Sequence, residues 1–207
     1  PGTAFAIAGL AVLPLATPHD APGSVCFVVD DGVDRLGVCT DLGESRDPIA
    51  DALATCQAVL IELNHDAEML RTGPYPMHLK RRIASAHGHL SNAEGASLLE
   101  RARRPHLSRV LLGHLSEVNN TPALALAAAR QVIDGGDVEV ACAPQHHPTG
   151  WLRVRRERSP SPPGPVADAR TSPSAKSAEE AGGEGLVVAV PRRHRALEAQ
   201  LALFSTT

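Results

Sequence analysis

Short apolar runs, separated by turns rich in Gly, Pro and Asp, dominate the first 155 residues of the chain. The runs with the length and composition of strands lie at 5–16, 24–30, 35–40, 58–62, 109–113 and 137–143. Segments with helical patterns lie at 47–56, 66–71, 75–86, 91–104 and 121–134. Strands come first and then alternate with helices, and this order predicts an α/β layered domain.

Polar residues mark where several of these helices begin. Asp47 stands directly before a proline, which predicts that it is the N-cap of its helix. Ser91 and Glu94 have the spacing of a capping box, in which side chain and backbone satisfy each other at a helix start. Thr121, again followed by proline, opens the last helix of the domain.

The composition of the chain changes at about residue 156. Residues 156–185 consist mainly of Pro, Ser, Gly and charged residues, which predicts a disordered linker because such a segment buries too little apolar surface to offset its ordering entropy. Residues 186–207 then suggest a short strand and an amphipathic helix. The predicted organisation is therefore a domain at 1–155, a linker at 156–185 and a short terminal segment at 186–207.

The overall composition narrows the class of protein. Hydrophobic residues make up 43% of the 207 residues but aromatic residues only 2%, so the core must be aliphatic. The net charge of −3 gives no global attraction to nucleic acid. The four cysteines show no close pairing, which favours reduced thiols and a cytoplasmic protein. No apolar run reaches the roughly 18 residues of a transmembrane helix, so no membrane partner is predicted.

Residues of metal-ligating type follow nearly every core strand. They are His19-Asp20, Thr40-Asp41, Glu62, Asn64-His65-Asp66 and His114. Strand ends form the floor of the functional cleft in layered α/β folds, so these positions are candidates for a site. Each also has a plainer interpretation, because a histidine after a strand is more often a hydrogen-bonded edge residue and an aspartate there can form a turn. Lys80-Arg81-Arg82 can likewise be a solvated helix face.

The pair His87 and His89 invites comparison with the zinc motif HxHxDH. Its continuation is Leu90-Ser91-Asn92, so the aspartate and the third histidine of that motif are missing. The pair also follows the TDLG segment, which is the wrong order. It is therefore rejected as the primary metal motif.

Four segments together resemble the YycJ/WalJ (VicX) branch of the metallo-β-lactamase-fold hydrolases. They are PHDAPGS, CTDLG, IELNHDAEMLRTGPYPMHLKRRIASAHGHLSN and LLGHLSEVNN, and the resemblance covers about residues 5–145. It implies an αββα sandwich with two divalent metal ions, zinc or manganese, at one edge. It also implies phosphodiester cleavage, of the type of a 5′-to-3′ DNA exonuclease linked to mismatch repair.

The resemblance also implies roles for individual residues. His19, Asp41 and His114 match metal ligands, with Asp41 as the bridge between the two ions. His89 matches a catalytic histidine near the scissile phosphate, and Glu62 is placed to orient it. The residues expected on the side of the DNA substrate are Lys80, Arg81, Arg82, His65 and Asp66.

One part of the family pattern is absent. HxHxDH should lie upstream of His19, and without it three ligand candidates serve two ions. The chain is therefore expected to be the C-terminal portion of such an enzyme, inactive alone, with the missing N-terminal half as a possible partner. Two alternatives stay open: a hydrolase of the same fold acting on a small ester or thioester, and a non-catalytic, truncated binding domain.

Overall fold

A seven-stranded sheet organises the computed structural model, which describes residues 1–133, 137–155 and 187–188. The strands lie in chain order across the sheet: β1 (Phe5–Ile7), β2 (Leu10–Ala16), β3 (Val25–Asp30), β4 (Arg35–Cys39), β5 (Ala58–Glu62), β6 (Arg109–Gly113) and β7 (Glu139–Cys142). Neighbours are antiparallel from β1 to β4 and parallel from β4 to β7. The strands predicted from the sequence are confirmed, with bounds that differ by no more than two residues. As a result β2, β4, β5 and β6 all point the same way.

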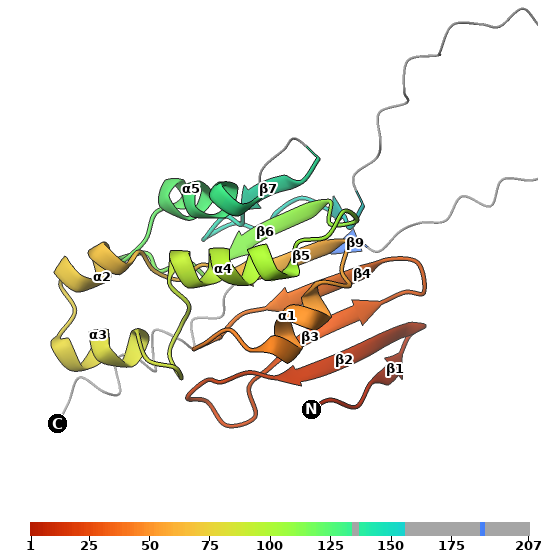
Figure 1. Cartoon of the computed structure of the whole chain (residues 1–207), viewed down its shortest axis with the longest axis horizontal. Helices are drawn as coiled ribbons and strands as arrows, with labels where there is room; N and C mark the ends of the chain where they lie inside the picture. The colour runs from red at the N-terminus through yellow and green to blue at the C-terminus, as the bar shows by residue number, and fades with distance from the viewer. Residues whose placement is uncertain (134–136, 156–186, 189–207) are drawn as a thin grey trace, which may run out of the picture.

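Five helices accompany the sheet within the described residues. They are α1 (Asp47–Leu53), α2 (Ala67–Thr72), α3 (Met77–Ile83), α4 (Asn92–Ala102) and α5 (Pro122–Val132). Figure 1 shows α1, α4 and α5 over one face of the sheet, whereas α2 and α3 project beyond the end toward which β4 and β6 point. No residue of α3 is buried. The helices α2 and α3 therefore form an arm at the carboxyl ends of the parallel strands.

The predicted helix caps agree with the structure in two cases out of three. Ser91 and Glu94 form a complete capping box at α4, and the Thr121 hydroxyl accepts a hydrogen bond from a backbone N–H of α5. The prediction that Asp47 caps α1 is wrong, because Arg46 is the N-cap and Asp47 is the first helical residue. The Asp47 carboxylate pairs with Arg101 instead of with a backbone N–H.

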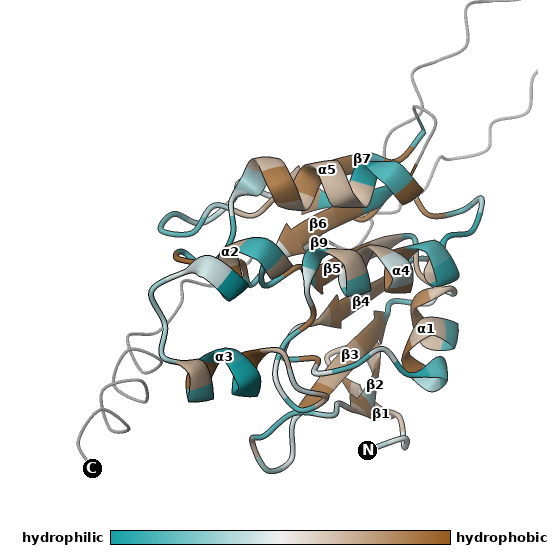
Figure 2. Ribbon diagram, turned by 60° about the vertical axis from the view of Figure 1, so that its left-hand side comes forward, coloured by the Kyte–Doolittle hydropathy of each residue, from teal (hydrophilic) through white to brown (hydrophobic). Residues whose placement is uncertain are grey.

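The main core lies between the sheet and α1, α4 and α5. It is aliphatic, as the composition predicts, and its largest members such as Leu53, Ile61 and Leu112 are fully buried. Cys26, Cys39 and Cys56 are free thiols buried in the same layer. Burial raises the pKa of Cys56 to about 11, so this thiol stays protonated and packs like a small apolar side chain. The strands appear as hydrophobic ribbons behind the helices in Figure 2.

The opposite face of the sheet is also apolar. Because side chains alternate along a strand, Phe27 and Leu60 point away from the helices, and both are only partly buried. Of the described residues, those around β8 (Leu152–Arg153) lie against this face, where Val154 packs on Leu36 and Ala58. The short strand β8 pairs with β9 (Val187–Val188). Of the expected αββα sandwich, the described residues thus form the seven-stranded sheet and one helical layer, and the short β8–β9 pair is a separate sheet.

Two sequence predictions lie outside the described residues: the disordered linker at 156–185 and, apart from 187–188, the terminal segment at 186–207. Among the described residues, every helix is too short or too polar to cross a membrane.

Candidate metal centre

The carboxyl ends of β2, β4 and β6 bring three predicted ligands together at one edge of the sheet. His19 Nε2 lies 3.5 Å from Asp41 Oδ1, and His114 Nε2 lies 3.6 Å from the same carboxylate oxygen. The side chains of His19 and His114 are 11% and 12% exposed, whereas that of Asp41 is 37% exposed. The site therefore opens to solvent at Asp41, with the two imidazoles beside it.

Two of these residues have an unusual backbone conformation. Asp41 has φ of 62° and His114 has φ of 56°, in the left-handed region that side chains rarely adopt. A residue held there costs on the order of 1–3 kcal/mol and persists only where its surroundings fix it. His114 directly follows the last residue of β6, and Asp41 lies two residues after the last residue of β4. At both positions the turn therefore directs the side chain out of the sheet and into the site.

Glu62, at the end of β5, is the residue that fixes these surroundings. Its carboxylate is fully buried and accepts five hydrogen bonds from three separate loops. The backbone donors are Asp41 N–H at 2.6 Å, Leu42 N–H at 3.1 Å and Leu90 N–H at 2.8 Å. The side-chain donors are His114 Nδ1 at 3.0 Å and His89 Nδ1 at 3.3 Å. These donors fill the lone pairs of the carboxylate, so Glu62 positions the site and has no place left for a metal.

The charge of Glu62 is stabilised in this environment. Burial alone would raise its pKa, but the hydrogen bonds from His114 and His89 outweigh burial and lower the pKa to about 2. Glu62 is therefore an ionised acceptor at neutral pH. The Nδ1 atoms of both histidines must then carry hydrogen in order to donate to it.

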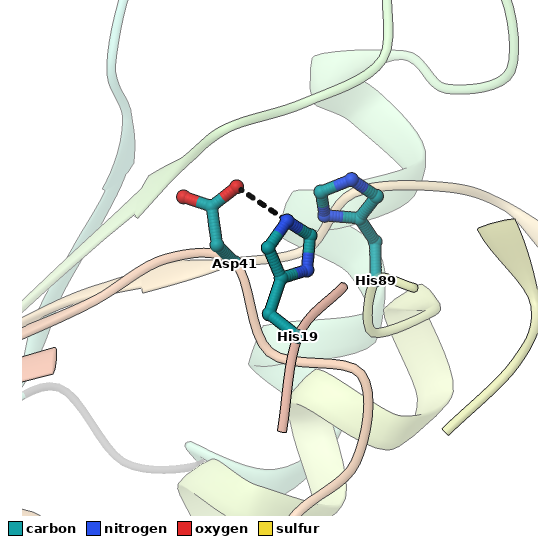
Figure 3. Close-up of side chains that lie close together, drawn as sticks. All are labelled: His19, Asp41 and His89. Atoms are coloured by element: carbon teal, nitrogen blue, oxygen red, sulfur yellow. Dashed lines mark ion pairs between the residues drawn. The ribbon is translucent and has the colours of Figure 1, made fainter. Parts of the chain in front are cut away.

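A hydrogen-bond acceptor lies at Nδ1 of His19, His89 and His114, and it determines the tautomer of each ring. The tautomers in turn show whether a metal ion fits the site. His19 Nδ1 lies 2.9 Å from the Gly88 carbonyl oxygen, which can only accept a hydrogen bond. With Nδ1–H bound to an acceptor, Nε2 of the neutral ring is left with a free lone pair, as in metal-binding histidines. The site thus presents bare imidazole nitrogens and a carboxylate (Figure 3), a donor set that fits a divalent metal ion.

His89 lies between the other two histidines. Its ring centroid is 5.0 Å from those of His19 and His114. Burial lowers its pKa, but the hydrogen bond and negative charge of Glu62, together with the charges of Asp41 and Asp20, outweigh burial and raise it. Because ligand atoms of His19, Asp41 and His89 lie within 4.8 Å of one another, His89 has the geometry for metal binding.

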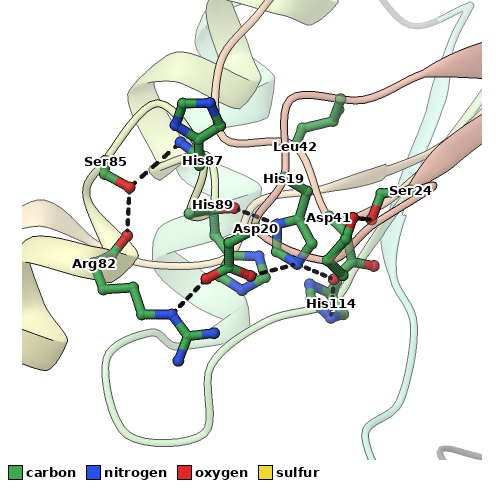
Figure 4. A network of polar contacts seen from close by, with 12 residues as sticks. His19, Asp20, Ser24, Asp41, Leu42, Arg82, Ser85, His87, His89 and His114 are labelled. Carbon is green, nitrogen blue, oxygen red and sulfur yellow. Dashed lines mark hydrogen bonds and ion pairs between the residues drawn. The ribbon is translucent and has the colours of Figure 1, made fainter.

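Asp20 also belongs to the site, although no specific role was predicted for it. Its Oδ1 lies 3.6 Å from His19 Nε2, and its other oxygen accepts a hydrogen bond from Arg82 Nε (Figure 4). Arg82 thereby connects the arm formed by α2 and α3 to the candidate centre. The only signal in the sequence was that Asp20 follows His19 directly at a strand end.

The other residues predicted on the substrate side are placed differently. The Lys80 ammonium donates to the Arg71 carbonyl oxygen at the end of α2, and Arg81 is exposed on α3. Asp66 is the N-cap of α2, and its carboxylate accepts a hydrogen bond from Met69 N–H. His65 is buried, and its Nδ1 has no hydrogen-bond partner among the described residues. Of this set, Arg82 is connected to the site through its hydrogen bond to Asp20. The substrate roles of all five residues stay predictions.

The glycines of TDLG and GHLSN allow their loops to pack against neighbouring backbone. A Cβ atom on Gly43 would stand 2.2 Å from the Ala86 carbonyl oxygen, and one on Gly88 would stand 2.2 Å from the Ile83 carbonyl oxygen. Gly43 N–H also donates to the Pro18 carbonyl oxygen at 2.8 Å, next to His19. Gly43 thus allows the loop that carries Asp41 to pack against the loops that carry His19 and His89, and Gly88 allows the segment before His89 to fold back on the end of α3.

The substitution Gly43→Ala is expected to destabilise the protein by about 1–3 kcal/mol, because the new methyl group meets backbone that cannot turn away. Thermal unfolding followed by circular dichroism is the measurement. Gly150→Ala is the control, since a Cβ there would contact nothing within 4 Å. An equal unfolding temperature for Gly43→Ala and the wild type would contradict the packing described for this loop.

Comparison with known proteins agrees with this geometry. The chain is 41% identical over 109 residues to exodeoxyribonuclease WalJ of Streptococcus pneumoniae (serotype 2, strain D39), covering 52% of this chain and 40% of the relative. It is 33% identical over 131 residues to exodeoxyribonuclease YycJ of Bacillus anthracis, covering 63% of this chain and 50% of the relative. No family model matches the chain. The chain therefore spans half or less of the length of these relatives.

A solved structure gives the fold. The metallo-β-lactamase fold protein YhfI of Bacillus subtilis superposes with a TM-score of 0.52 at 17% identity, over 69% of this chain and 50% of that protein. The fold of the described domain is the metallo-β-lactamase fold, as the sequence predicts. The matched segments of the chain are similar in sequence to WalJ and YycJ.

Proposed function

We propose that this chain contributes the His19–Asp41–His114 side of a dinuclear metal centre to a phosphodiester hydrolase of the DNA exonuclease type. The observation that carries the proposal is the convergence of the imidazole Nε2 atoms of His19 and His114 on the Asp41 carboxylate. The names of the relatives, both exodeoxyribonucleases, support DNA as the substrate. Zinc and manganese are the candidate metals, because both accept imidazole and carboxylate ligands.

The chain's own residues have distinct tasks in this proposal. A bound pair of divalent ions supplies an activated water and neutralises the phosphate oxygens. Asp41 offers a carboxylate whose two oxygens can face two cations, and His19 and His114 add ligands without adding charge. Glu62 holds Asp41, His89 and His114 in register. His89 lies beside Asp41, and Arg82 is paired with Asp20 next to His19; both are assigned to the phosphate group of the substrate. Arg81 on the arm is assigned to the DNA backbone, for which it adds positive charge.

The remaining ligands are proposed to come from the HxHxDH segment of a preceding half of the protein. A catalytic zinc takes about three protein ligands, so two ions need more than the three residues assigned here. Two observations support a missing half: the relatives are at least twice as long as the matched portion, and the second face of the sheet carries apolar residues such as Phe27 and Leu60.

An activity assay on two proteins tests the proposal. The 207-residue chain alone is expected to show little hydrolysis of 5′-labelled DNA with Mn²⁺ or Zn²⁺. A fusion of this chain to the N-terminal half of the Bacillus anthracis relative is expected to degrade DNA from its 5′ end. Cleavage of a thioester but not of DNA by the fusion would favour the small-molecule hydrolase. Tight metal binding without hydrolysis of either substrate would favour a binding domain.

In the active fusion, His89→Ala is expected to lower the turnover number by about 10²–10⁴-fold, the usual contribution of a positioned acid or base. Metal content, measured by atomic emission, is expected to stay nearly intact because His89 is assigned to the substrate and not to the ions. His147→Ala, at an exposed histidine, is the control. Loss of one metal ion per protein in His89→Ala would instead make His89 a ligand.

A further inference from the structure

Several buried asparagines lie directly behind the candidate centre. Asn64, Asn92 and Asn120 are 7%, 6% and 5% exposed, respectively. A buried amide is retained only where its donors and acceptors are satisfied, so each of these side chains must bond to specific neighbours. Their hydrogen-bond partners differ: Asn64 bonds to the predicted ligand His114, whereas Asn92 and Asn120 bond to each other.

Asn64 bonds on both sides of the left-handed turn at His114. Its side-chain Nδ2 donates to the His114 carbonyl oxygen at 2.8 Å, and its backbone carbonyl accepts from Ser116 N–H at 2.8 Å. One residue earlier, Leu63 N–H donates to the Gly113 carbonyl oxygen at 3.3 Å. The turn is therefore fastened to the end of β5 immediately before, at and after His114.

This fastening has a consequence for the imidazole. The left-handed φ at His114 turns its carbonyl away from the hydrogen-bonding ladder of the sheet, and the Asn64 amide supplies the donor that the ladder would have given. The turn also aims the side chain so that Nδ1 meets Glu62 Oε2 and Nε2 faces Asp41. Without the Asn64 amide, the His114 carbonyl oxygen would be buried without a hydrogen bond. We expect the backbone at His114 then to return to an extended conformation, which would move the imidazole ring.

Asn92 and Asn120 make a different kind of contact. Their side-chain amides bond to each other, with distances of 3.0 and 2.8 Å between the donor and acceptor atoms. Asn120 Nδ2 also donates to the Leu63 carbonyl oxygen at 2.8 Å. This pair connects the start of α4 to the loop before α5 and touches none of His19, Asp41 and His114. Asn120 is therefore a buried amide of the same kind that lies next to Asn64 in the fold but does not hold a ligand.

We propose that Asn64 is a positioning residue, which holds His114 in its left-handed conformation so that the imidazole Nε2 is presented to a metal ion at Asp41. The inference rests on the metal-binding role proposed for His114. It goes beyond that role because it assigns the geometry of the ligand to a side chain that touches neither the metal nor the substrate. The two parts are separable, since the conformation of His114 can be observed without metal.

Nuclear magnetic resonance of the metal-free 207-residue chain tests the conformation. In the wild type, the Nδ1–H protons of His89 and His114 are expected to give two slowly exchanging signals, because both are bound to Glu62. Asn64→Ala is expected to lose the His114 signal and keep that of His89. The matched control Asn120→Ala is expected to keep both. Retention of the His114 signal in Asn64→Ala would overturn the proposal.

A zinc titration of the active fusion, which supplies the remaining ligands, against a competing chromophoric chelator tests the consequence. Asn64→Ala is expected to bind Zn²⁺ about 10–100-fold more weakly than the wild type, the usual effect of removing a partner that orients a ligand. Asn120→Ala is expected to lose thermal stability without losing zinc affinity. Equal losses of affinity in both variants would make Asn64 a structural residue only. If Asn64→Ala does not fold, Asn64→Asp, which keeps the shape but cannot donate, replaces it under the same criteria. Failure of the wild type to bind zinc would refute the metal centre and leave the resonance result intact.

Discussion

Replacing Glu62 with glutamine is expected to destabilise the protein by about 3–5 kcal/mol, the usual cost of breaking a buried charged network by removing one partner. Five donors from three loops converge on this carboxylate. The amide of glutamine keeps one acceptor oxygen and turns the other position into a donor, which would face N–H groups. For a domain of this size, the unfolding temperature is expected to fall by roughly 10–15 °C.

Thermal unfolding at neutral pH measures this effect, with Glu100→Gln on the exposed side of α4 as the control. The pH dependence provides a second check. Because the pKa of Glu62 is lowered from the ordinary value of 4.5 to about 2, its contribution is fully present above about pH 4.5 and is lost as the pH falls toward 2. The difference between variant and wild type should therefore narrow over that interval. A Glu62→Gln protein as stable as the control would contradict the positioning role.

Replacing Asp41 with asparagine is expected to abolish DNA hydrolysis in the active fusion, with a loss of at least about a thousandfold, because the metal ions contribute several kcal/mol to such reactions. Asparagine keeps the size of the side chain and tolerates the left-handed backbone at this position, so the fold should survive. What it removes is the negative charge that two cations would share.

The measurement combines the rate of DNA cleavage with metal content and the unfolding temperature. Asp51→Asn, at an exposed position of α1, is the control for the same chemical change elsewhere. Full cleavage activity in Asp41→Asn would end the assignment of Asp41 as the bridging carboxylate. Loss of activity together with loss of folding would be visible in the unfolding temperature and would be distinguished from loss of metal.

The sequence was most informative where a local pattern determines the structure. Alternation and turn residues predicted the strands, and the polar residues at strand ends, together with the family resemblance, predicted that His19, Asp41 and His114 converge. The direction of the strands, which places these residues at one edge, was not predicted. The sequence also pointed to Glu62 as an orienting group for His89. It gave no measure of how many donors meet there, because Leu42 and Leu90 reach Glu62 through backbone N–H groups that every residue possesses.

Asn64 and Asp20 were noted at strand ends but were assigned no role, because their partners lie far away in the chain. Asn64 bonds to a carbonyl 50 residues away, and Asp20 pairs with Arg82 across 62 residues. A side-chain amide at the end of a strand looks the same in the sequence whether it caps a turn or holds a ligand. Conversely, His65 and Asp66 stand out in the sequence pattern, yet Asp66 caps a helix and His65 is enclosed beside it. Only tertiary contacts separate these cases.

The left-handed backbone at positions 41 and 114 restricts what a protein engineer could build at this edge. Outside glycine, asparagine, aspartate and histidine are the side chains most often found in that conformation, whereas β-branched residues are strongly disfavoured there. Valine and threonine are therefore poor choices at both positions for steric reasons, before any chemistry is considered. The backbone at both positions thus favours a few residue types, most of which can bind a metal ion. Changing the metal preference of the centre would therefore mean exchanging these residue types for one another.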